Sequence, residues 1–193
     1  MAGIRVTVGV KGAAFARAKL SRRAAEKATR AMFAELLKGA LLIEGRARRR
    51  APVDLGQLRA SLTHSGLLPR GDALVVAIGT NDRKAPFVEF GTGPLGRRSK
   101  LTETAREAMR ELGYEHGPRG GFPPVDLIGA WAKRRGITKG MDDDEAESVA
   151  FAIARAIRAH GTPAQPFLFP AFEESRKEIE RGIGAAVRAE VER

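Results

Sequence analysis

Four consecutive acidic residues, Asp142 to Glu145, form the densest group of carboxylates in the sequence. Hard cations such as Mg²⁺ bind several carboxylate oxygens, so this run is the candidate metal site of a nuclease. A helix is predicted to begin at the same place, where an aspartate cap and the helix dipole both favour acidic residues. A nuclease also needs carboxylates from other rigid elements, and no second acidic cluster occurs. We therefore interpret the run as a helix cap.

Motifs for nucleophilic catalysis and phosphate binding are missing from the sequence. It has no G-x-S-x-G, P-loop or G-x-G-x-x-G motif, and the GTGPLG stretch at 91–96 lacks the G-K-[ST] ending of a phosphate loop. The absence of cysteine excludes disulfides and thiolate metal sites, and three scattered histidines argue against catalytic zinc. The sequence predicts no catalytic residue, cofactor or metal, and therefore a protein that is not an enzyme.

Basic side chains are the remaining candidates for chemistry. The net charge is +11, and residues 1–50 carry +10 of it, from 13 basic and 3 acidic residues. Such an excess suits the phosphates of nucleic acid or the carboxylates of a protein partner. The candidate residues for contact with a neighbouring subunit or with DNA are Arg23, Lys27, Arg30, Lys38, Arg46, Arg48, Arg49, Arg50, Arg59, Arg97 and Arg98.

A long amphipathic helix must position most of these residues. From about residue 13 to residue 50 the apolar residues recur with a helical period, and the cations lie opposite them. Pro52 ends the helix. Leu41 falls on the cationic side, which indicates a second apolar contact. The arginines of RARRR at 46–50 suit the helix C-terminal carbonyls, and we expect them to face a partner subunit. The apolar side holds Ala18, Ala25, Met32, Leu36 and Ile43.

A small sheet is predicted to pack on this helix. Apolar and polar residues alternate over residues 4–10, as in a half-buried strand. The stretches SLTHSGLL (61–68) and ALVVAIG (73–79) predict a hairpin, whose second strand is apolar enough to be covered on both faces. A short helix restarts after Pro52, where Asp54 has the spacing of a capping box with Gln57.

Further helices are predicted within SKLTETAREAMREL (99–112), at 124–136, from the acidic run to residue 160, and from about residue 171. The fold class is therefore α+β, with a small antiparallel sheet packed on a long N-terminal helix and a C-terminal helix. We predict a single domain, 1–193, in which 91–161 is a loop and helical insertion. No apolar run approaches the roughly 20 residues of a membrane span, so no membrane partner is predicted.

Three stretches, taken in order, resemble one protein family. They are RAPVDLGQLRASL (50–62), APFVEFGT (85–92) and QPFLFPAFEES (165–175). Together with the flanking helices they are similar to the neck and tail-completion family of long-tailed bacteriophages, a minor tail component of lambdoid type. The stretch PPVDLIGAWAKRRGI (123–137) resembles an insertion in a branch of that family. Leu55 replaces a common threonine, and Ala85 and Phe87 replace common tyrosines.

The resemblance implies a structural virion protein, made in the host cytoplasm and placed in the neck, at the head-tail junction. It implies a homo-oligomeric ring through which DNA passes, most simply a hexamer. One side would meet the head connector or a head-completion protein, and the other the tail terminator or tail tube. The loop from Gly91 to Phe122 is expected to contact a neighbouring subunit or the tail tube.

Each family motif has an expected structural role. Gly56 permits a tight turn, Asp54 caps the helix restart, and Arg59 pairs across a fold or subunit contact. Phe87 and Phe90 are expected core residues, Glu89 a cap or ion-pair partner, and Gly91 a sharp exit. Two prolines flank an extended segment that places Phe167 and Phe169 on the core. The motif residues are Pro52, Asp54, Gly56, Leu58, Phe87, Glu89, Phe90, Gly91, Pro166, Phe167 and Pro170.

An alternative stays open from the charge distribution. The basic helix could bind DNA without reading its sequence, since no zinc finger, basic zipper or interleaved aromatic pattern occurs. A solvated helix face would account for the same residues. Genomic DNA is therefore a candidate for nonspecific contact beside the protein partners.

Overall fold

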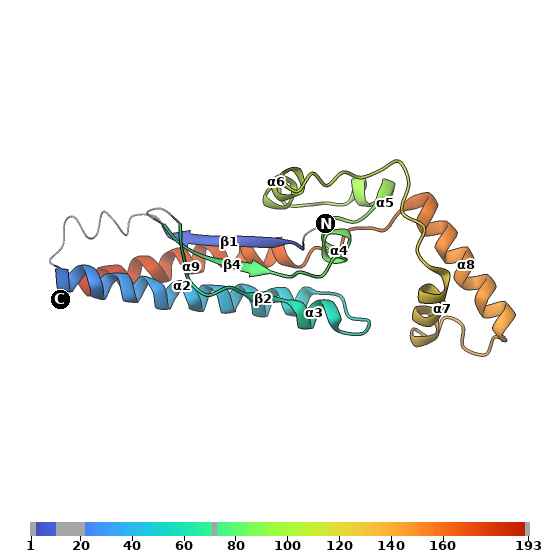
Figure 1. The fold of residues 1–193 in the computed structure, drawn as a ribbon, viewed down its shortest axis with the longest axis horizontal. Coiled ribbons are helices and arrows are strands. Elements are labelled where there is room, and N and C mark those ends of the chain that lie inside the picture. Colours follow the sequence, from blue (N-terminus) through green and yellow to red (C-terminus); the bar gives the residue numbers. More distant parts are fainter. Residues whose placement is uncertain (1–2, 11–21, 71–72, 192–193) are drawn as a thin grey trace. The chain divides into compact units, whose positions relative to one another are not determined.

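Residues 3–10, 22–70 and 73–191 are described by a computed structural model (Figure 1). The chain divides into two units, one formed by residues 1–85 with 166–193 and the other by residues 86–165. The first unit combines a sheet with the two longest helices. The second unit is helical apart from one isolated β-bridge. This composition confirms the predicted α+β class.

The sheet of the first unit is antiparallel and has β4 (Ala73–Gly79) at its centre. β1 (Arg5–Val10) pairs with one edge of β4, and β2 (Thr63–His64) and β3 (Leu68–Arg70) pair with the other. Val6 lies opposite Ile78 in this register, and both side chains are buried. The predicted strand and hairpin are confirmed. Residues 73–75 and Ala77 of β4 are only half-buried, so the predicted cover on both faces is incomplete.

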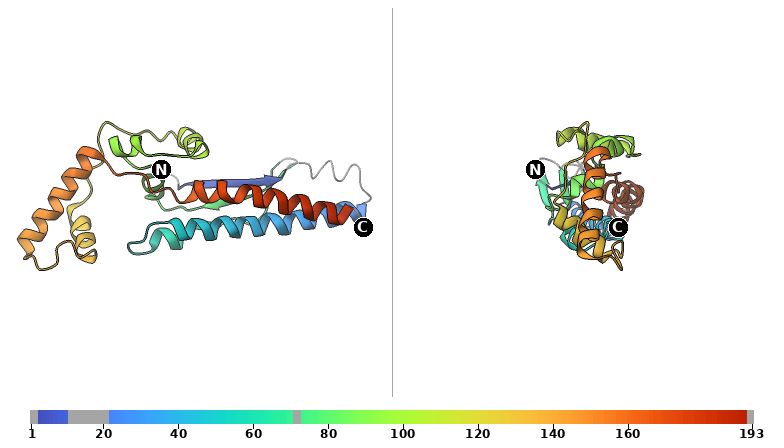
Figure 2. Two further views of the ribbon diagram at one scale, coloured as in Figure 1. Left: turned by 180° about the vertical axis from the view of Figure 1, so that it is seen from behind. Right: turned by 90° about the vertical axis from the view of Figure 1, so that its right-hand side faces the viewer.

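Two long helices, α2 (Arg22–Arg50) and α9 (Leu168–Val191), lie side by side along the sheet (Figures 1 and 2). The predicted apolar stripe of α2 is confirmed for its described residues, while Ala18 and residues 13–21 lie outside them. Gly39 admits Ile179 of α9, since a Cβ at Gly39 would lie 2.7 Å from Ile179 Cγ1. The buried residues of this face are Ala25, Met32, Leu36, Ala40 and Ile43.

The turn after α2 differs from the prediction at its cap. α3 (Gln57–Ser61) exists as expected, but its N-cap is Gly56, which has φ 77° and makes no side-chain cap hydrogen bond. The expectation that Asp54 caps the helix is therefore wrong. The left-handed Gly56 turns the chain directly before Gln57, which leaves Asp54 outside the cap position.

The start of α9 also differs from the prediction. The segment between Pro166 and Pro170 is not extended, because α9 begins at Leu168. Pro170 is tolerated there, since backbone N–H groups in the first helical turn have no partner inside the helix. The expected burial of Phe167 and Phe169 is confirmed.

The second unit contains five helices. They are α4 (Ala85–Phe90, whose first residue belongs to the first unit), α5 (Gly93–Arg98), α6 (Glu103–Glu111), α7 (Val125–Arg134) and α8 (Asp143–His160). The predictions for α6, α7 and α8 are confirmed. α5 lies in the predicted loop from Gly91 to Phe122, and α4 was not predicted. No helix in the described residues is long and apolar enough to cross a membrane.

The chain enters and leaves the second unit at one point. Thr92 and Thr162 form an isolated antiparallel bridge, with Thr92 N donating to Thr162 O at 2.9 Å. A Cβ at Gly161 would lie 1.9 Å from Thr92 O, so the two segments meet at a spacing that only glycine permits.

Candidate interaction surfaces

Two of the arginines at the end of α2 form side-chain contacts with α9 of the same chain. Arg46 donates from Nη1 to Ser175 Oγ at 2.8 Å and from Nη2 to Glu178 Oε2 at 3.0 Å. Arg50 pairs with Glu174. Sequence reasoning missed these contacts because the three acceptors lie more than 120 residues further along the chain. Arg46 and Arg50 thus use part of their hydrogen-bonding capacity within the chain. The expectation that the arginines of 46–50 face a partner subunit stays a prediction.

A second cluster joins α2 to β2. Glu44 is 7% exposed, and its carboxylate lies 2.7 Å from Arg48 Nη2 and 2.5 Å from His64 Nδ1. Arg48 also donates to Leu62 O at 2.7 Å. The buried carboxylate is thus held by two partners, one of them a neighbour on its own helix. The cluster fixes the hairpin strand against the helix.

A row of exposed cations remains on α2. Arg23, Lys27 and Arg30, here called the cation row, lie on one side of the helix at i, i+4 and i+7. No ion pair within the described residues involves them. Lys38 extends the row but pairs with Glu35. Leu41, also on this side, is 57% exposed, as predicted from its position.

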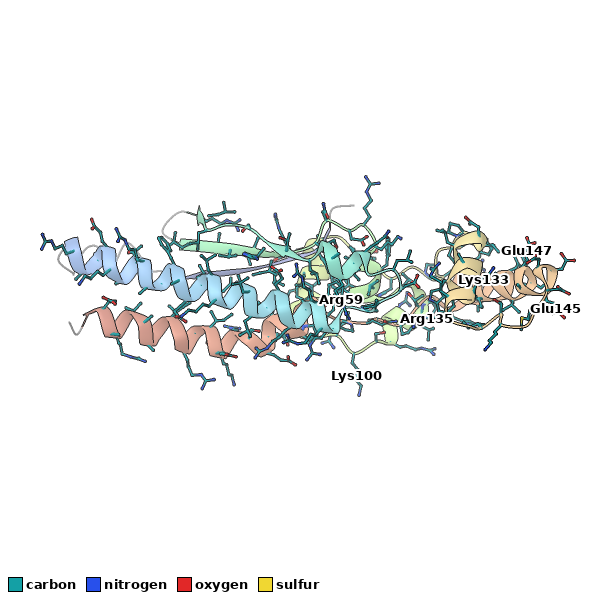
Figure 3. All side chains as sticks on the ribbon, turned by 90° about the horizontal axis from the view of Figure 1, so that it is seen from below. Arg59, Lys100, Lys133, Arg135, Glu145 and Glu147 are labelled. Atoms are coloured by element: carbon teal, nitrogen blue, oxygen red, sulfur yellow. The ribbon has the colours of Figure 1, made fainter. Side chains whose placement is uncertain are left out.

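Two of the other candidate arginines form hydrogen bonds within their own unit. Arg59 of α3, labelled in Figure 3, donates to Ala51 O at 3.2 Å and so bridges the turn after α2. Arg97 donates to His116 O at 3.0 Å, while Arg98 and Arg49 are exposed and have no ion pair among the described residues. The cation row and Arg59 belong to the first unit, whereas Arg97 and Arg98 belong to the second.

A buried aromatic cluster organises the second unit. The ring centroid of Tyr114 lies 5.3 Å from that of Phe90 and 5.7 Å from that of His116. Tyr114 Oη donates to Gly91 O at 2.5 Å, and His116 Nε2 lies 2.8 Å from Phe90 O. Burial raises the pKa of Tyr114, so the phenol stays protonated well above neutral pH. Tyr114 and His116 were not predicted from the sequence. The glycines beside them, Gly113 and Gly117, were the available sign of a tightly packed turn.

The motif APFVEFGT is confirmed in part. Phe90 is fully buried, and Gly91 has φ 73°, as a sharp exit requires. Phe87 is 39% exposed, so its expected place in the core is wrong: it packs by its edge on Tyr114 at a centroid distance of 5.9 Å. Glu89 is fully buried.

The acidic run is a helix cap in the structure. Asp142 accepts from Glu145 N at 2.8 Å, and Glu145 Oε2 lies 3.3 Å from Asp142 N, which completes a capping box. Across residues 3–10, 22–70 and 73–191, no group of three or more His, Asp or Glu side chains is placed to hold a metal ion.

One comparison with known proteins identifies part of the chain. Residues 14–91 match the family model described as "Bacteriophage HK97-gp10, putative tail-component". No curated protein and no solved structure matches the chain. The matched residues include α2, the sheet hairpin and α4. They contain the whole first motif and all but the last residue of the second. Residues 14–91 carry the sequence pattern of a bacteriophage tail-component family, which confirms the family resemblance expected from the motifs.

Proposed function

We propose that this protein is a structural component of a bacteriophage virion, located in the neck between the head connector and the tail tube. The observation that carries the proposal is the match of residues 14–91 to a phage tail-component family. The fold is compatible with it, because the described part of the matched segment forms a helix-and-sheet module, in which α2 packs on α9 and on β4. Its role is mechanical joining, without a chemical step.

In this role several copies form a ring through which the genome passes. The family resemblance implies that this ring is a hexamer. The head connector or a head-completion protein lies on one side of the ring, and the tail terminator or tail tube on the other. Within such a ring the cation row faces either the DNA or an acidic surface of an adjacent ring.

Inactivation of the gene in its phage tests the proposal. The expected result is full heads and complete tails that stay separate in electron micrographs, with joining restored by the purified protein. Mass spectrometry of purified virions is expected to detect the chain. Normal infectious particles from the inactivated phage, or virions that lack the protein, would contradict the proposal.

A second candidate is nonspecific DNA binding, favoured by the exposed cation row. Each phosphate that the row neutralises contributes a slope of about −0.9 to the dependence of log affinity on log salt. Replacement of Arg23, Lys27 and Arg30 by glutamine is therefore expected to flatten the slope by up to about 2.7.

The matched control replaces three basic residues of α9, Arg176, Lys177 and Arg181, by glutamine. These residues lie on the other long helix, so the slope for duplex DNA is expected to stay unchanged. Equal slopes for all three proteins, or no measurable binding at low salt, would exclude the cation row as a DNA site.

A further inference from the structure

The hairpin formed by α7 and α8 buries three alanines and leaves two of its large apolar side chains exposed. The buried residues of the two helices are Ala132, Ala150 and Ala154. Leu127 is 57% exposed and Phe151 is 48% exposed. Single exposed apolar residues are ordinary on protein surfaces, but several on one small element mark an interaction surface. The exposed side chains of the hairpin are therefore a candidate interaction surface.

One part of this area is an aromatic knob, formed by Phe122, Phe151 and Arg158. The rings of Phe122 and Phe151 meet edge to face, with centroids 6.2 Å apart. The guanidinium of Arg158 lies 5.9 Å from the centroid of Phe122. Gly120 N donates to Arg158 O at 2.9 Å, which fixes the Phe122 segment on α8. The knob is thus apolar, held in position by contacts within the chain, and positively charged at its edge.

The second part is a shallow groove at the other end of α8. It is lined by Met141, Asp144, Glu145, Ser148 and Val149. Met141 and Val149 make it apolar, while the two carboxylates make it acidic. Figure 3 shows Glu145 and Glu147 projecting from this end of the helix. The groove thus carries the charge opposite to that of the knob.

The knob and the groove face different directions on α8. Each residue of an α-helix turns the chain by about 100°, so Val149 and Phe151 point about 200° apart. One copy can therefore present its knob to one neighbour and its groove to another. Contacts of this head-to-tail kind generate rings when the rotation closes.

We propose that the aromatic knob of one copy docks in the groove of the next copy. Phe122 and Phe151 cover Met141 and Val149 of the neighbour, and Arg158 faces Asp144. The occupant is a second copy because this chain itself supplies an apolar, cationic surface that matches the apolar, acidic groove. The contact between copies does not depend on the proposed function. Only the closure of these contacts into a ring rests on it.

Cysteine cross-linking of the full chain tests the contact, since the protein has no native cysteine. The variant carries Gly121→Cys beside the knob and Ser148→Cys in the groove. A Cβ at Gly121 meets nothing within 4 Å, so the first change is tolerated. Gly120 packs on Gly161 just past α8, whereas Ser148 lies about 18 Å before that end. A disulfide needs Cα atoms within about 7 Å, so any bond joins two copies.

Under oxidation we expect a ladder of dimers, trimers and larger species. The control pair, Glu103→Cys with Arg110→Cys on α6, lies about 10 Å apart and is expected to stay monomeric. Phe151→Glu in the 121/148 background is expected to abolish the ladder, while Leu127→Glu leaves it intact. A monomeric 121/148 variant, or equal ladders from both cysteine pairs, would overturn the contact.

Light scattering of the unmodified protein separates this contact from the proposed function. A ring-sized species whose 121/148 variant forms no ladder would overturn the knob-and-groove contact and leave the tail role standing. A ladder from a protein that is absent from virions would support the contact and contradict the proposed function.

Discussion

At the scale of single residues, Gly91 has the tightest constraint among the family motifs. Its φ is 73°, and an added Cβ would lie 2.6 Å from Ala164 N and 2.7 Å from Thr162 O. We expect Gly91→Ala to lower the free energy of unfolding by about 3 kcal/mol or more, from backbone strain and overpacking together. Urea denaturation measures this loss.

Gly113 provides the matched control for that variant. Gly113 has φ 60°, but no atom lies within 4 Å of an added Cβ. Gly113→Ala is therefore expected to lower the free energy of unfolding by about 1 kcal/mol, from backbone strain alone. Equal losses for the two alanine variants would show that the close approach at Gly91 contributes nothing.

Tyr114 makes a second prediction at this scale. Tyr114→Phe keeps the ring but leaves Gly91 O without its donor, and is expected to destabilise the protein by about 1 kcal/mol at neutral pH. Because burial raises the pKa of Tyr114, the folded protein holds this proton while the unfolded chain loses it near pH 10. Wild-type stability is therefore expected to fall more steeply above pH 10 than that of the variant.

The pH dependence can be followed directly, since Tyr114 is the single tyrosine of the chain. Phenolate absorbance reports its titration in the folded protein, and thermal unfolding at each pH reports stability. Ionisation of the folded protein at or below pH 10 would contradict the expected direction.

At the scale of elements, Arg46 braces α2 against α9. Arg46→Met removes the hydrogen bonds to Ser175 and Glu178 and is expected to cost about 1–2 kcal/mol in unfolding free energy. Arg49→Met, three residues along the same helix, is expected to change stability by less than about 0.5 kcal/mol. Equal effects of the two variants would mean that the contacts with α9 do not stabilise the fold.

The capping box of α8 makes the second prediction at this scale. Asp142→Ala is expected to lower stability by about 0.5–2 kcal/mol, whereas Asp143→Ala, one residue later, has a smaller effect. Thermal unfolding with and without magnesium distinguishes a cap from a metal site. A large stabilisation of the wild type by magnesium, lost in Asp143→Ala, would contradict the cap interpretation.

At the scale of the whole molecule, the bridge between Thr92 and Thr162 places the ends of the second unit together. Two residues suffice to join antiparallel partners, so residues 93–161 are replaceable by an Asn-Gly turn. We expect the shortened chain to keep the helical circular dichroism of α2 and α9 and to unfold cooperatively. An unfolded or aggregated product would show that the first unit does not fold without residues 93–161, and would contradict the proposal that 91–161 is an insertion.

Much of the secondary structure could be predicted because it depends on local patterns. The alternation in β1, the helical period of α2 and the acidic start of α8 each report which face of an element is buried or capped. The short helices α4 and α5 could not be predicted, because six residues give too few turns for a periodic pattern.

The candidate surfaces were predicted less completely than the fold. The sequence located the basic helix and the exposed position of Leu41, and its motifs predicted the family. It did not reveal that Arg46 and Arg50 bind residues of α9, that Phe87 is partly exposed, or that Tyr114 closes over Gly91. These outcomes depend on residues far apart in the chain.

The sequence by itself determined the α+β class, most element types and the concentration of charge in the first 50 residues, because periodicity, caps and composition are local properties. Only the tertiary structure decided which cations are paired and where the two units divide. It also decided that α8 carries a knob and a groove on different sides. The physical reason is that burial and pairing depend on long-range packing, and packing assigns partners that no local pattern specifies.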